Sequence, residues 1–408
     1  MQTKKIIYQL IALLLILFTS CSKSSNNSTG KLLLISFDGF RYDYLSKTET
    51  PNFDRFISIG VMAESLIPVV PTKTFPNHYS IVTGLYPENS GLVGNTMYDP
   101  EWDEWYRISD REAVANGDWY QGEPIWNTAE RQGLTTGTMF WIGSEAEING
   151  MRPTYWKKFD AGMNNRARID TVVSWFVKQE NPIDFGTLYF GMVDSQGHQH
   201  GPASDSLVVA VQEADQLLGY LVHKLQQKQL WDKMNVLIVS DHGMTELSAD
   251  KIITLDSLVN MDDIQRYILE PVTMIQPDSG KVEQVYQQLK RSELHYTVYR
   301  KEELPERYHL KNHSRVMDII MLADIPYTIL KSEHKESFIN NLPQGTHGYD
   351  NINKDMHGIF AARGPSFTAG NTVSPFELVH LYELMAHLLE LEPAPNEGSL
   401  DSIKTLLK

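Results

Sequence analysis

The sequence predicts an α/β fold with a mostly parallel central sheet, helices on both faces of the sheet and an inserted cap. Short apolar runs alternate with amphipathic helical segments, which is the pattern of a parallel sheet. Three of the runs are closely followed by an aspartate, and binding sites of open α/β sheets form at the carboxyl ends of the strands. A chain of 408 residues is also long enough to bury a large core.

The first strand is expected at 31–36, an apolar run that is followed by Asp38. A proline-bounded loop at 71–76 then carries Thr74 and leads into a helix predicted to start near Asn77. The N-terminus of a helix offers free N–H groups and a partial positive charge. A phosphate group is therefore favoured beside Thr74, although a threonine before a helix is more often only a cap.

The middle of the chain continues the alternation of strands and helices. Asp194 follows one apolar run, with His198 four residues later on what we expect to be a tight loop. Asp241 and His242 follow the next run. The strands are expected at 135–141, 185–193 and 236–240, and the helices at 169–177 and 205–230.

Residues 251–346 show a less regular pattern, which predicts an inserted cap subdomain. The chain is expected to return to the sheet at 359–362, directly after His357, and to end in a helix at 377–391. The predicted catalytic core therefore has two parts, 31–250 and 347–408.

The N-terminus has the pattern of a targeting segment. Two lysines precede an apolar run at 6–18 that is too short to span a membrane comfortably. The run ends before Cys21, the only cysteine, in a sequence that resembles a bacterial lipobox. We expect a lipoprotein signal peptide over 1–21, a lipid on Cys21 and a polar tether over 22–30. An ordinary signal peptide with an incidental cysteine is the alternative.

These features place the protein in the bacterial cell envelope, facing the periplasm or on the outer-membrane surface. The net charge of −15 argues against a nucleic-acid polymer as partner, because such binders are usually basic. It is compatible with a small phosphorylated substrate, since bound cations reverse the local charge. No obligate protein partner is evident.

Carboxylate, imidazole and hydroxyl side chains form one candidate constellation. Mixed carboxylate and imidazole ligands favour zinc over magnesium or calcium. Their number fits two ions better than one, and a two-metal site stabilises both the attacking and the leaving oxygen of a displacement. The candidates are Asp38, Thr74, Asp194, His198, Asp241, His242 and His357.

At this point a family resemblance becomes specific. The sequence is similar to the nucleotide pyrophosphatase/phosphodiesterase family of the alkaline phosphatase superfamily, from residue 32 to about 365. The matching motifs are Ser36-Phe37-Asp38-Gly39-Phe40-Arg41, Thr72-Lys73-Thr74-Phe75-Pro76-Asn77-His78, Gly94-Asn95, Asp194-Ser195-Gln196-Gly197-His198 with Gly201-Pro202, Ser240-Asp241-His242-Gly243-Met244, and His347-Gly348-Tyr349 with Met356-His357-Gly358.

The resemblance implies an alkaline-phosphatase-like fold and two Zn²⁺ ions. It assigns one ion to Asp194, His198 and His357. It assigns the other ion to Asp38, Asp241 and His242, with Thr74 as the nucleophile bound to that ion.

The resemblance also implies the substrate contacts. Asn95 and the backbone N–H of Phe75 would hydrogen-bond a phosphate oxygen. Phe75 and Tyr189 would sandwich a nucleobase, and Trp141 would line the same pocket. The implied reaction is the hydrolysis of nucleotide phosphodiester and pyrophosphate bonds to nucleoside 5′-monophosphates, through a covalent threonine intermediate.

Three alternatives remain open at this point. One is a lysophospholipid or choline phosphodiesterase with the same site. A second is a phosphomonoesterase, which would need a cation near the nucleophile; Lys73 is adjacent to Thr74 but is expected to point away. The third is a non-catalytic surface lipoprotein, which would not require a complete ligand set.

The lipobox generates a first testable prediction. We expect Cys21→Ser to release the protein from membranes or to block its maturation, because the thiol that carries the lipid is lost. Membrane fractionation of cells that express each form measures this. If the wild-type protein is itself found in the soluble periplasmic fraction, the anchor does not exist.

Overall fold

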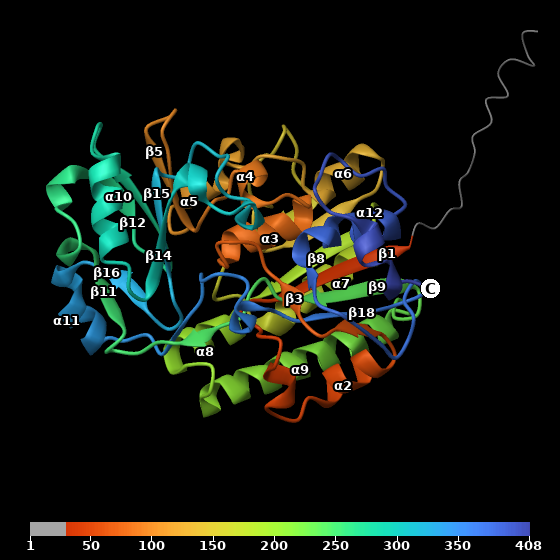
Figure 1. Ribbon diagram of the computed structural model, residues 1–408. Helices are drawn as coiled ribbons and strands as arrows, with labels where there is room; N and C mark the ends of the chain where they lie inside the picture. Colours follow the sequence, from red (N-terminus) through yellow and green to blue (C-terminus); the bar gives the residue numbers. More distant parts are fainter. Residues whose placement is uncertain (1–29) are drawn as a thin grey trace, which may run out of the picture.

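The computed structural model describes residues 30–408, and an eight-stranded sheet forms its centre (Figure 1). Strand β1 (Lys31–Phe37) lies between β8 (Phe185–Phe190) and β9 (Met234–Val239) and runs parallel to both. Nearly all residues of these strands are buried. The continuous apolar runs of the sequence therefore correspond to strands that are covered on both faces.

The strand order of the sheet is β19-β2-β18-β9-β1-β8-β6-β7. Strands β6 (Thr136–Met139) and β7 (Tyr155–Lys157) extend the parallel set beyond β8. On the other side, β18 (Phe360–Arg363) runs antiparallel to both of its neighbours, β9 and β2. The prediction of a mostly parallel sheet is confirmed. The two remaining strands are β2 (Val61–Ala63) and β19 (Asn371–Val373).

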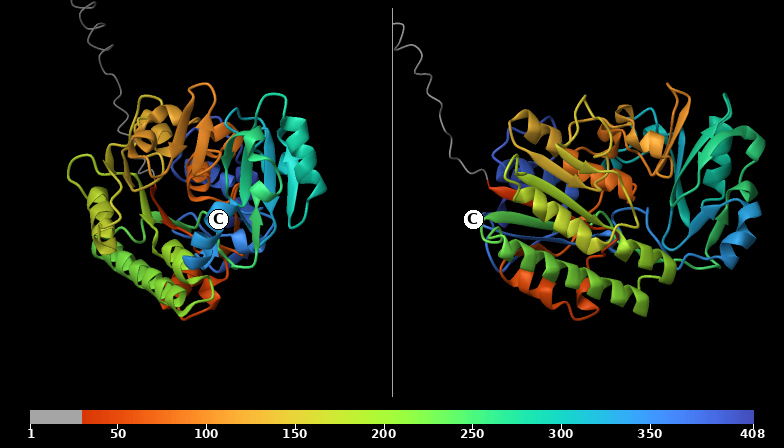
Figure 2. Two further views of the ribbon diagram at one scale, coloured as in Figure 1. Left: turned by 90° about the vertical axis from the view of Figure 1, so that its left-hand side faces the viewer. Right: turned by 180° about the vertical axis from the view of Figure 1, so that it is seen from behind.

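Helices cover both faces because successive residues of a strand point to opposite sides. Leu32 and Leu34 of β1 pack in one hydrophobic cluster with helices α3, α6 and α12. Leu33 and Ile35 pack in a second cluster with α2, α7 and α9. Figures 1 and 2 show these two layers. The helices are α2 (Pro51–Ser58), α3 (Thr74–Thr83), α6 (Ile125–Arg131), α7 (Asn165–Phe176), α9 (Asp205–Gln227) and α12 (Leu381–Leu388).

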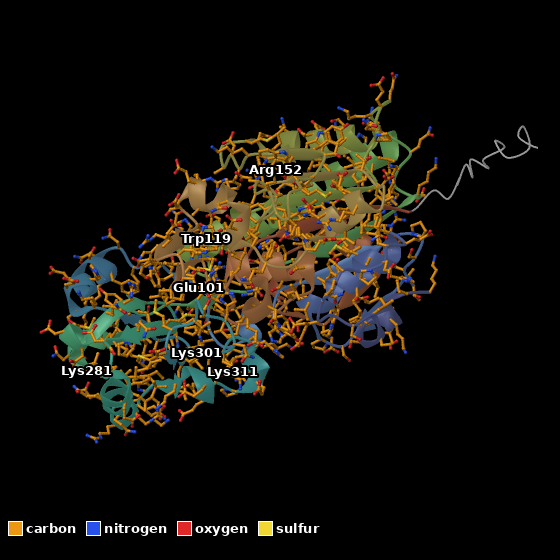
Figure 3. The ribbon with its side chains drawn as sticks, turned by 90° about the horizontal axis from the view of Figure 1, so that it is seen from above. Glu101, Trp119, Arg152, Lys281, Lys301 and Lys311 are labelled. Carbon is orange, nitrogen blue, oxygen red and sulfur yellow. The ribbon has the colours of Figure 1, made fainter. Side chains whose placement is uncertain are left out.

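A second, four-stranded antiparallel sheet comes from the region for which a cap was predicted. Its order is β12-β13-β15-β14, and α10 (Val282–Arg291) packs against it. Seen from above, Lys281, Lys301 and Lys311 mark this lobe, while Trp119 and Arg152 lie on the larger one (Figure 3). The elements of the lobe are β11 (Ile252–Thr254), β12 (Ile264–Ile268), β13 (Val272–Pro277), β14 (Tyr296–Arg300), β15 (Ile319–Ala323), β16 (Thr328–Leu330) and α11 (Ser332–Asn340).

Three predicted elements differ from the structure. The helix expected to start near Asn77 starts at Thr74, so Thr74 belongs to α3 and not to the preceding loop. The strand expected at 185–193 ends at Phe190, and helix α8 (Met192–His200) follows it. Asp194 and His198 therefore lie one helical turn apart on the same side of α8, not on a tight loop. The helix expected at 377–391 is a short 3₁₀ turn (Leu378–His380) followed by α12.

The shorter elements connect these layers. They are β3 (Leu66–Ile67), α4 (Pro87–Ser90), β4 (Thr96–Asp99), β5 (Glu104–Arg107), α5 (Arg111–Ala115), β10 (Thr245–Glu246), β17 (Gly345–Thr346) and β20 (Phe376–Glu377). Among residues 30–408, no helix combines the length and the apolar character that crossing a membrane requires. The predicted signal peptide, the lipidation of Cys21 and nearly all of the tether lie outside the described residues.

Candidate active site

The carboxyl ends of β1, β8 and β9 bring three aspartates together. Asp38 follows β1, Asp241 follows β9, and Asp194 belongs to the first turn of α8. The backbone N–H of Asp194 donates to the carbonyl of Asp38 at 3.0 Å, and that of Gly39 donates to Asp241 Oδ1 at 3.2 Å. A Cβ atom on Gly39 would lie 2.8 Å from Asp194 Cα, so only glycine permits this approach.

The first group of potential ligands is Asp38, Asp241 and His242, all of which are buried. His242 Nε2 lies 3.4 Å from Asp38 Oδ1 and 3.0 Å from Asp241 Oδ2. Thr74 is the first residue of α3, and its Oγ1 lies 3.3 Å from the same nitrogen. The structure therefore brings four of the predicted site residues to one point.

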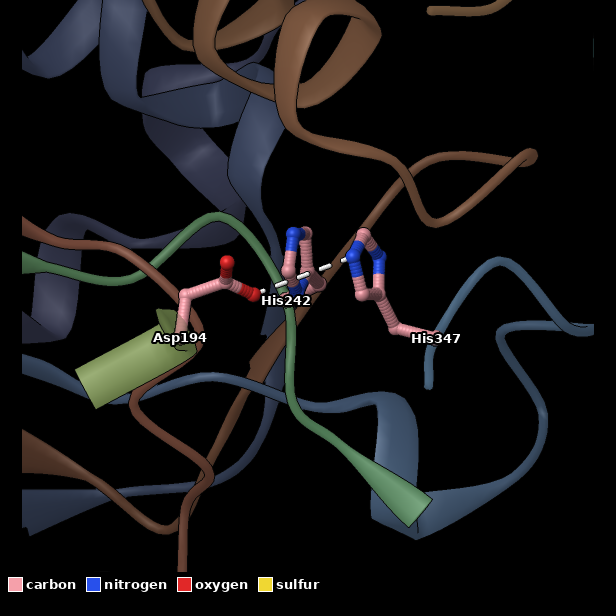
Figure 4. A group of neighbouring side chains, drawn as sticks. All are labelled: Asp194, His242 and His347. Carbon is pink, nitrogen blue, oxygen red and sulfur yellow. Dashed lines mark ion pairs between the residues drawn. The ribbon is translucent and has the colours of Figure 1, made fainter. Parts of the chain in front are cut away.

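The second group is Asp194, His198 and His347. His198 Nε2 lies 3.4 Å from Asp194 Oδ1 and 3.2 Å from His347 Nε2. The contact between Asp194 Oδ1 and His347 Nε2 measures 3.8 Å and is drawn in Figure 4. The rings of His347 and His242 are stacked with centroids 3.6 Å apart, so the two groups are adjacent.

The prediction that His357 is a metal ligand is wrong. Its Nδ1 lies 2.9 Å from Ser65 Oγ, and its Nε2 lies 2.9 Å from the carbonyl of Asn351. Both ring nitrogens are therefore engaged away from the aspartates, and His347 occupies the position in the cluster. His347 directly follows β17, so the end of the cap region supplies this side chain.

Backbone carbonyls fix the tautomer of the three clustered histidines. The Nδ1 atoms of His198, His242 and His347 lie 2.9, 2.9 and 2.8 Å from the carbonyls of Gly345, Gly243 and Thr72. A carbonyl only accepts, so each Nδ1 carries a hydrogen, and each ring in its neutral form presents the Nε2 lone pair to the cluster. The lone pairs of His198 and His347 face each other at 3.2 Å, which a cation between them would stabilise.

The carboxylates also indicate a site for cations. One oxygen of each aspartate is buried without a hydrogen-bond donor among the described residues, namely Asp38 Oδ1, Asp194 Oδ1 and Asp241 Oδ2. Zinc bonds of about 2.0–2.1 Å in tetrahedral geometry place neighbouring ligand atoms roughly 3.3–3.4 Å apart. Most of the distances within the two groups are close to this value, so the residues fit two divalent cations.

Burial and crowding shift the ionisation of these groups. Burial, together with the negative charges of Asp241 and Asp194, raises the pKa of Asp38 well above its usual range. Burial raises the pKa of Asp194 to about 6, and burial and the nearby His242 hold the pKa of His347 well below its usual value. Bound cations would oppose the two carboxyl shifts, because they favour ionised carboxylates, and would reinforce the lowered pKa of His347, because they favour neutral imidazoles.

Comparison with known proteins identifies the family. The sequence model of the type I phosphodiesterase/nucleotide pyrophosphatase family matches residues 32–350. The chain belongs to this family. Its relatives are hydrolases, and the chain is therefore an enzyme of that class.

Individual relatives match nearly the whole of this phosphodiesterase and most of their own length. It is 37% identical to human ectonucleotide pyrophosphatase/phosphodiesterase family member 5 over 377 residues, which cover 92% of this chain and 78% of the human protein. It is 39% identical to the bis(5′-adenosyl)-triphosphatase of Bos taurus over 394 residues, which cover 96% of this chain and 85% of the bovine protein.

Solved structures also match. An inactive threonine-to-alanine variant of murine ectonucleotide pyrophosphatase/phosphodiesterase 5, in complex with AMP, superposes with a TM-score of 0.89. The sequences are 36% identical, and the match covers 93% of this chain and all of the murine chain. The α/β fold of the phosphodiesterase, with its mostly parallel sheet, is thus the fold of known family structures.

Side chains around the ligand groups hold them in place. The hydroxyl of Tyr189 donates to Asp38 Oδ2 at 2.6 Å. The buried ring of His78 lies with Nδ1 3.2 Å from Asp241 Oδ2 and with Nε2 2.8 Å from Ser36 Oγ. Such contacts orient metal ligands and typically affect metal affinity about 10–100-fold.

Asn95 lies beside the nucleophile, but in a different role from the expected one. Its Oδ1 accepts the backbone N–H of Phe75 at 3.0 Å, so in this structure that N–H is engaged by the protein. This contact fixes the orientation of the Asn95 side-chain amide. Its Nδ2 carries two hydrogens and can donate a hydrogen bond. Asn95 therefore remains a candidate for binding a phosphate oxygen.

A cavity of about 260 Å³ opens from Thr74, and its walls are mainly apolar. Phe75, Tyr189 and Trp141 all line it, and Trp141 Nε1 donates to the carbonyl of His78 at 3.0 Å. Sequence reasoning missed Phe159, which also lines the cavity and is 40% exposed. This exposure is a property of the folded structure, and no pattern in the sequence around Phe159 indicates its role.

The assignment of His347 gives a paired test. We expect His347→Ala to lose one of two bound metal ions and to lower kcat/KM by at least about 100-fold, because a metal ligand is removed. His357→Ala is the matched control and should keep both ions, since the two ring nitrogens of His357 are engaged by Ser65 Oγ and by the carbonyl of Asn351. Metal analysis of the purified variants measures both. Retention of two ions by His347→Ala, with loss of one by His357→Ala, would contradict the assignment.

Proposed function

We propose that this phosphodiesterase hydrolyses nucleotide phosphodiester and pyrophosphate bonds to nucleoside 5′-monophosphates, with two zinc ions and Thr74 as covalent nucleophile. One observation carries the proposal. Thr74 Oγ1 lies 3.3 Å from His242 Nε2, between a cluster of six carboxylate and imidazole ligands and an aromatic cavity.

The two ligand groups fit two ions of zinc. Asp38, Asp241 and His242 would hold one, and a second set would hold the other. The second set is Asp194, His198 and His347. When bound, the ions supply positive charge beside the attacking and the leaving oxygen.

The protein's own groups then define the reaction. Thr74 Oγ1 loses its proton and attacks phosphorus, the bond to the leaving alcohol or pyrophosphate breaks, the leaving oxygen takes up a proton, and a phosphothreonine ester forms. Water hydrolyses that ester and releases the nucleoside 5′-monophosphate. Thr74 begins α3, so the partial positive charge of the helix N-terminus stabilises negative charge on the phosphoryl group. The Nδ2 group of Asn95 would donate to one of its oxygens, and the support is the contact of Asn95 with the backbone of Phe75, next to the nucleophile.

The cavity supports a nucleotide as substrate. Phe75 and Phe159 offer aromatic surface beside Thr74, and stacking gives about 1–3 kcal/mol per base with little dependence on its identity. The inactive murine relative was solved with AMP, and the bovine relative is named for cleavage of a dinucleoside triphosphate.

The alternative of a phosphomonoesterase has less support. Lys73 Nζ lies 3.6 Å from Glu270 Oε2 of the cap, and its side chain packs against Gly348. Its positive charge is thus paired within the protein. A monoester, with its additional negative charge, gains more from an unpaired cation beside the nucleophile.

The proposal places the enzyme in the bacterial cell envelope, anchored by a lipid on Cys21. The support is the apolar run at 6–18 followed by the lipobox-like sequence. A small nucleotide is then the partner, together with the membrane that holds the lipid.

The role of Thr74 can be tested by substitution and by stereochemistry. Thr74→Ala should lower kcat by about 10⁴–10⁶-fold while it keeps both metal ions, because only the nucleophile is lost. Thr74→Ser is the control and should keep measurable activity. With a chiral phosphorothioate diester, two successive displacements predict retention of configuration at phosphorus. Inversion would show that water attacks directly.

The substrate assignment can be tested at the cavity wall. Phe159→Ala should raise KM about 10-fold for p-nitrophenyl thymidine 5′-phosphate, because stacking is lost, and should barely change turnover of methyl p-nitrophenyl phosphate. Trp156→Ala is the matched control, since Trp156 is equally exposed but does not line the cavity. Steady-state kinetics with both esters measure this. Equal losses on both esters would mean that the cavity does not bind the nucleoside.

A further inference from the structure

Three segments that form walls of the cavity converge on one buried side chain, Arg168 of α7. The residue is only 5% exposed. Its Nη1 donates to the carbonyl of Tyr189 at 3.1 Å, and its Nε donates to the carbonyl of Met163 at 3.1 Å. Its Nη2 donates to the carbonyls of Asp160 and Ala161 at 3.4 and 3.3 Å. The guanidinium thus ties the end of β8 to the loop that directly follows Phe159.

The same side chain supports a third part of the wall. Arg168 Cζ lies 4.9 Å from the ring centroid of Phe140, which lines the cavity. Phe140 has a φ of +64°, a strained left-handed conformation for a bulky residue, which persists only where the surroundings enforce it. The Phe140 ring also packs edge-on against Phe159, with centroids 5.3 Å apart.

The cost of burying this charge shows that the contact is specific. Within residues 30–408, no carboxylate forms an ion pair with Arg168, whereas the equally buried Arg315 pairs with Asp99 at 2.7 Å. Arg168 is satisfied by backbone carbonyls and the Phe140 ring alone. Only the planar five-donor fork of arginine reaches carbonyls on two separate segments, which the point charge of lysine cannot do.

We propose that Arg168 is a positioning residue that holds Phe140, Phe159 and Tyr189 as the walls of the nucleoside-binding cavity. It touches neither the ligand cluster nor Thr74: it contacts Tyr189 at the backbone carbonyl, whereas the contact with Asp38 is made by the hydroxyl at the far end of the Tyr189 side chain. It therefore sets the affinity for the nucleoside part of the substrate and leaves the chemical step unchanged. This inference rests on the proposed function, because it assumes that the cavity receives a nucleoside.

Two esters with the same leaving group test the proposal. One is p-nitrophenyl thymidine 5′-phosphate, and the other is methyl p-nitrophenyl phosphate, which has no nucleoside. Arg168→Lys should raise KM for the thymidine ester about 10-fold or more and change kcat less than about 3-fold. For the methyl ester kcat/KM should stay within about 2-fold, and the metal content should not change. Arg166→Lys, an exposed position on the same helix, should behave as the wild type.

A neutral variant covers the case in which Arg168→Lys does not fold. Arg168→Gln keeps two donors, buries no unpaired charge and should show the same selective rise in KM. Equal losses on the two esters, or no loss on either, would overturn the role of Arg168 while the proposed function stands. A wild-type enzyme with no lower KM for the thymidine ester than for the methyl ester would overturn the nucleotide assignment and this inference together.

Discussion

Three carboxylate oxygens that have no hydrogen-bond donor among residues 30–408 meet at the buried end of the central sheet, and the rest of the site depends on this arrangement. They belong to Asp38, Asp194 and Asp241. Like charges in a buried, low-dielectric setting repel strongly, and uncompensated carboxylates are costly to bury. The fold accepts this cost because the ends of three adjacent parallel strands fix the aspartates. Histidine lone pairs point to the same space, so cations are the natural complement.

The fold and the cap supply different parts of this centre. The core strands provide the three aspartates, and α3 places Thr74 beside His242. The segment that leaves the cap is hydrogen-bonded to Thr72, two residues before the nucleophile. Thr72 donates its hydroxyl to the carbonyl of Tyr349 at 3.0 Å and accepts the backbone N–H of Gly348 at 2.9 Å. These two hydrogen bonds join the segment that leads into α3 to the loop that carries His347.

Much of this could be predicted from the sequence, because the signals are local. Apolar runs followed by Asp38 and Asp241 identify buried strands and the functional edge of the sheet. The choice between His347 and His357 could not be predicted, because it depends on the path of the chain as it leaves the cap. The sequence predicts a loop at Asp194, because Met192 and Val193 extend the preceding apolar run. In the structure helix α8 begins at Met192. The role of Phe159 arises from tertiary packing around Arg168, which leaves no periodic pattern.

We propose that two zinc ions bind at the carboxyl end of the central sheet, one in each ligand group. Anomalous diffraction at the zinc edge from crystals of the enzyme tests it most directly. The account predicts two peaks, one among Asp38, Asp241 and His242 and the other among Asp194, His198 and His347. A single peak, or a peak coordinated by His357, would contradict it.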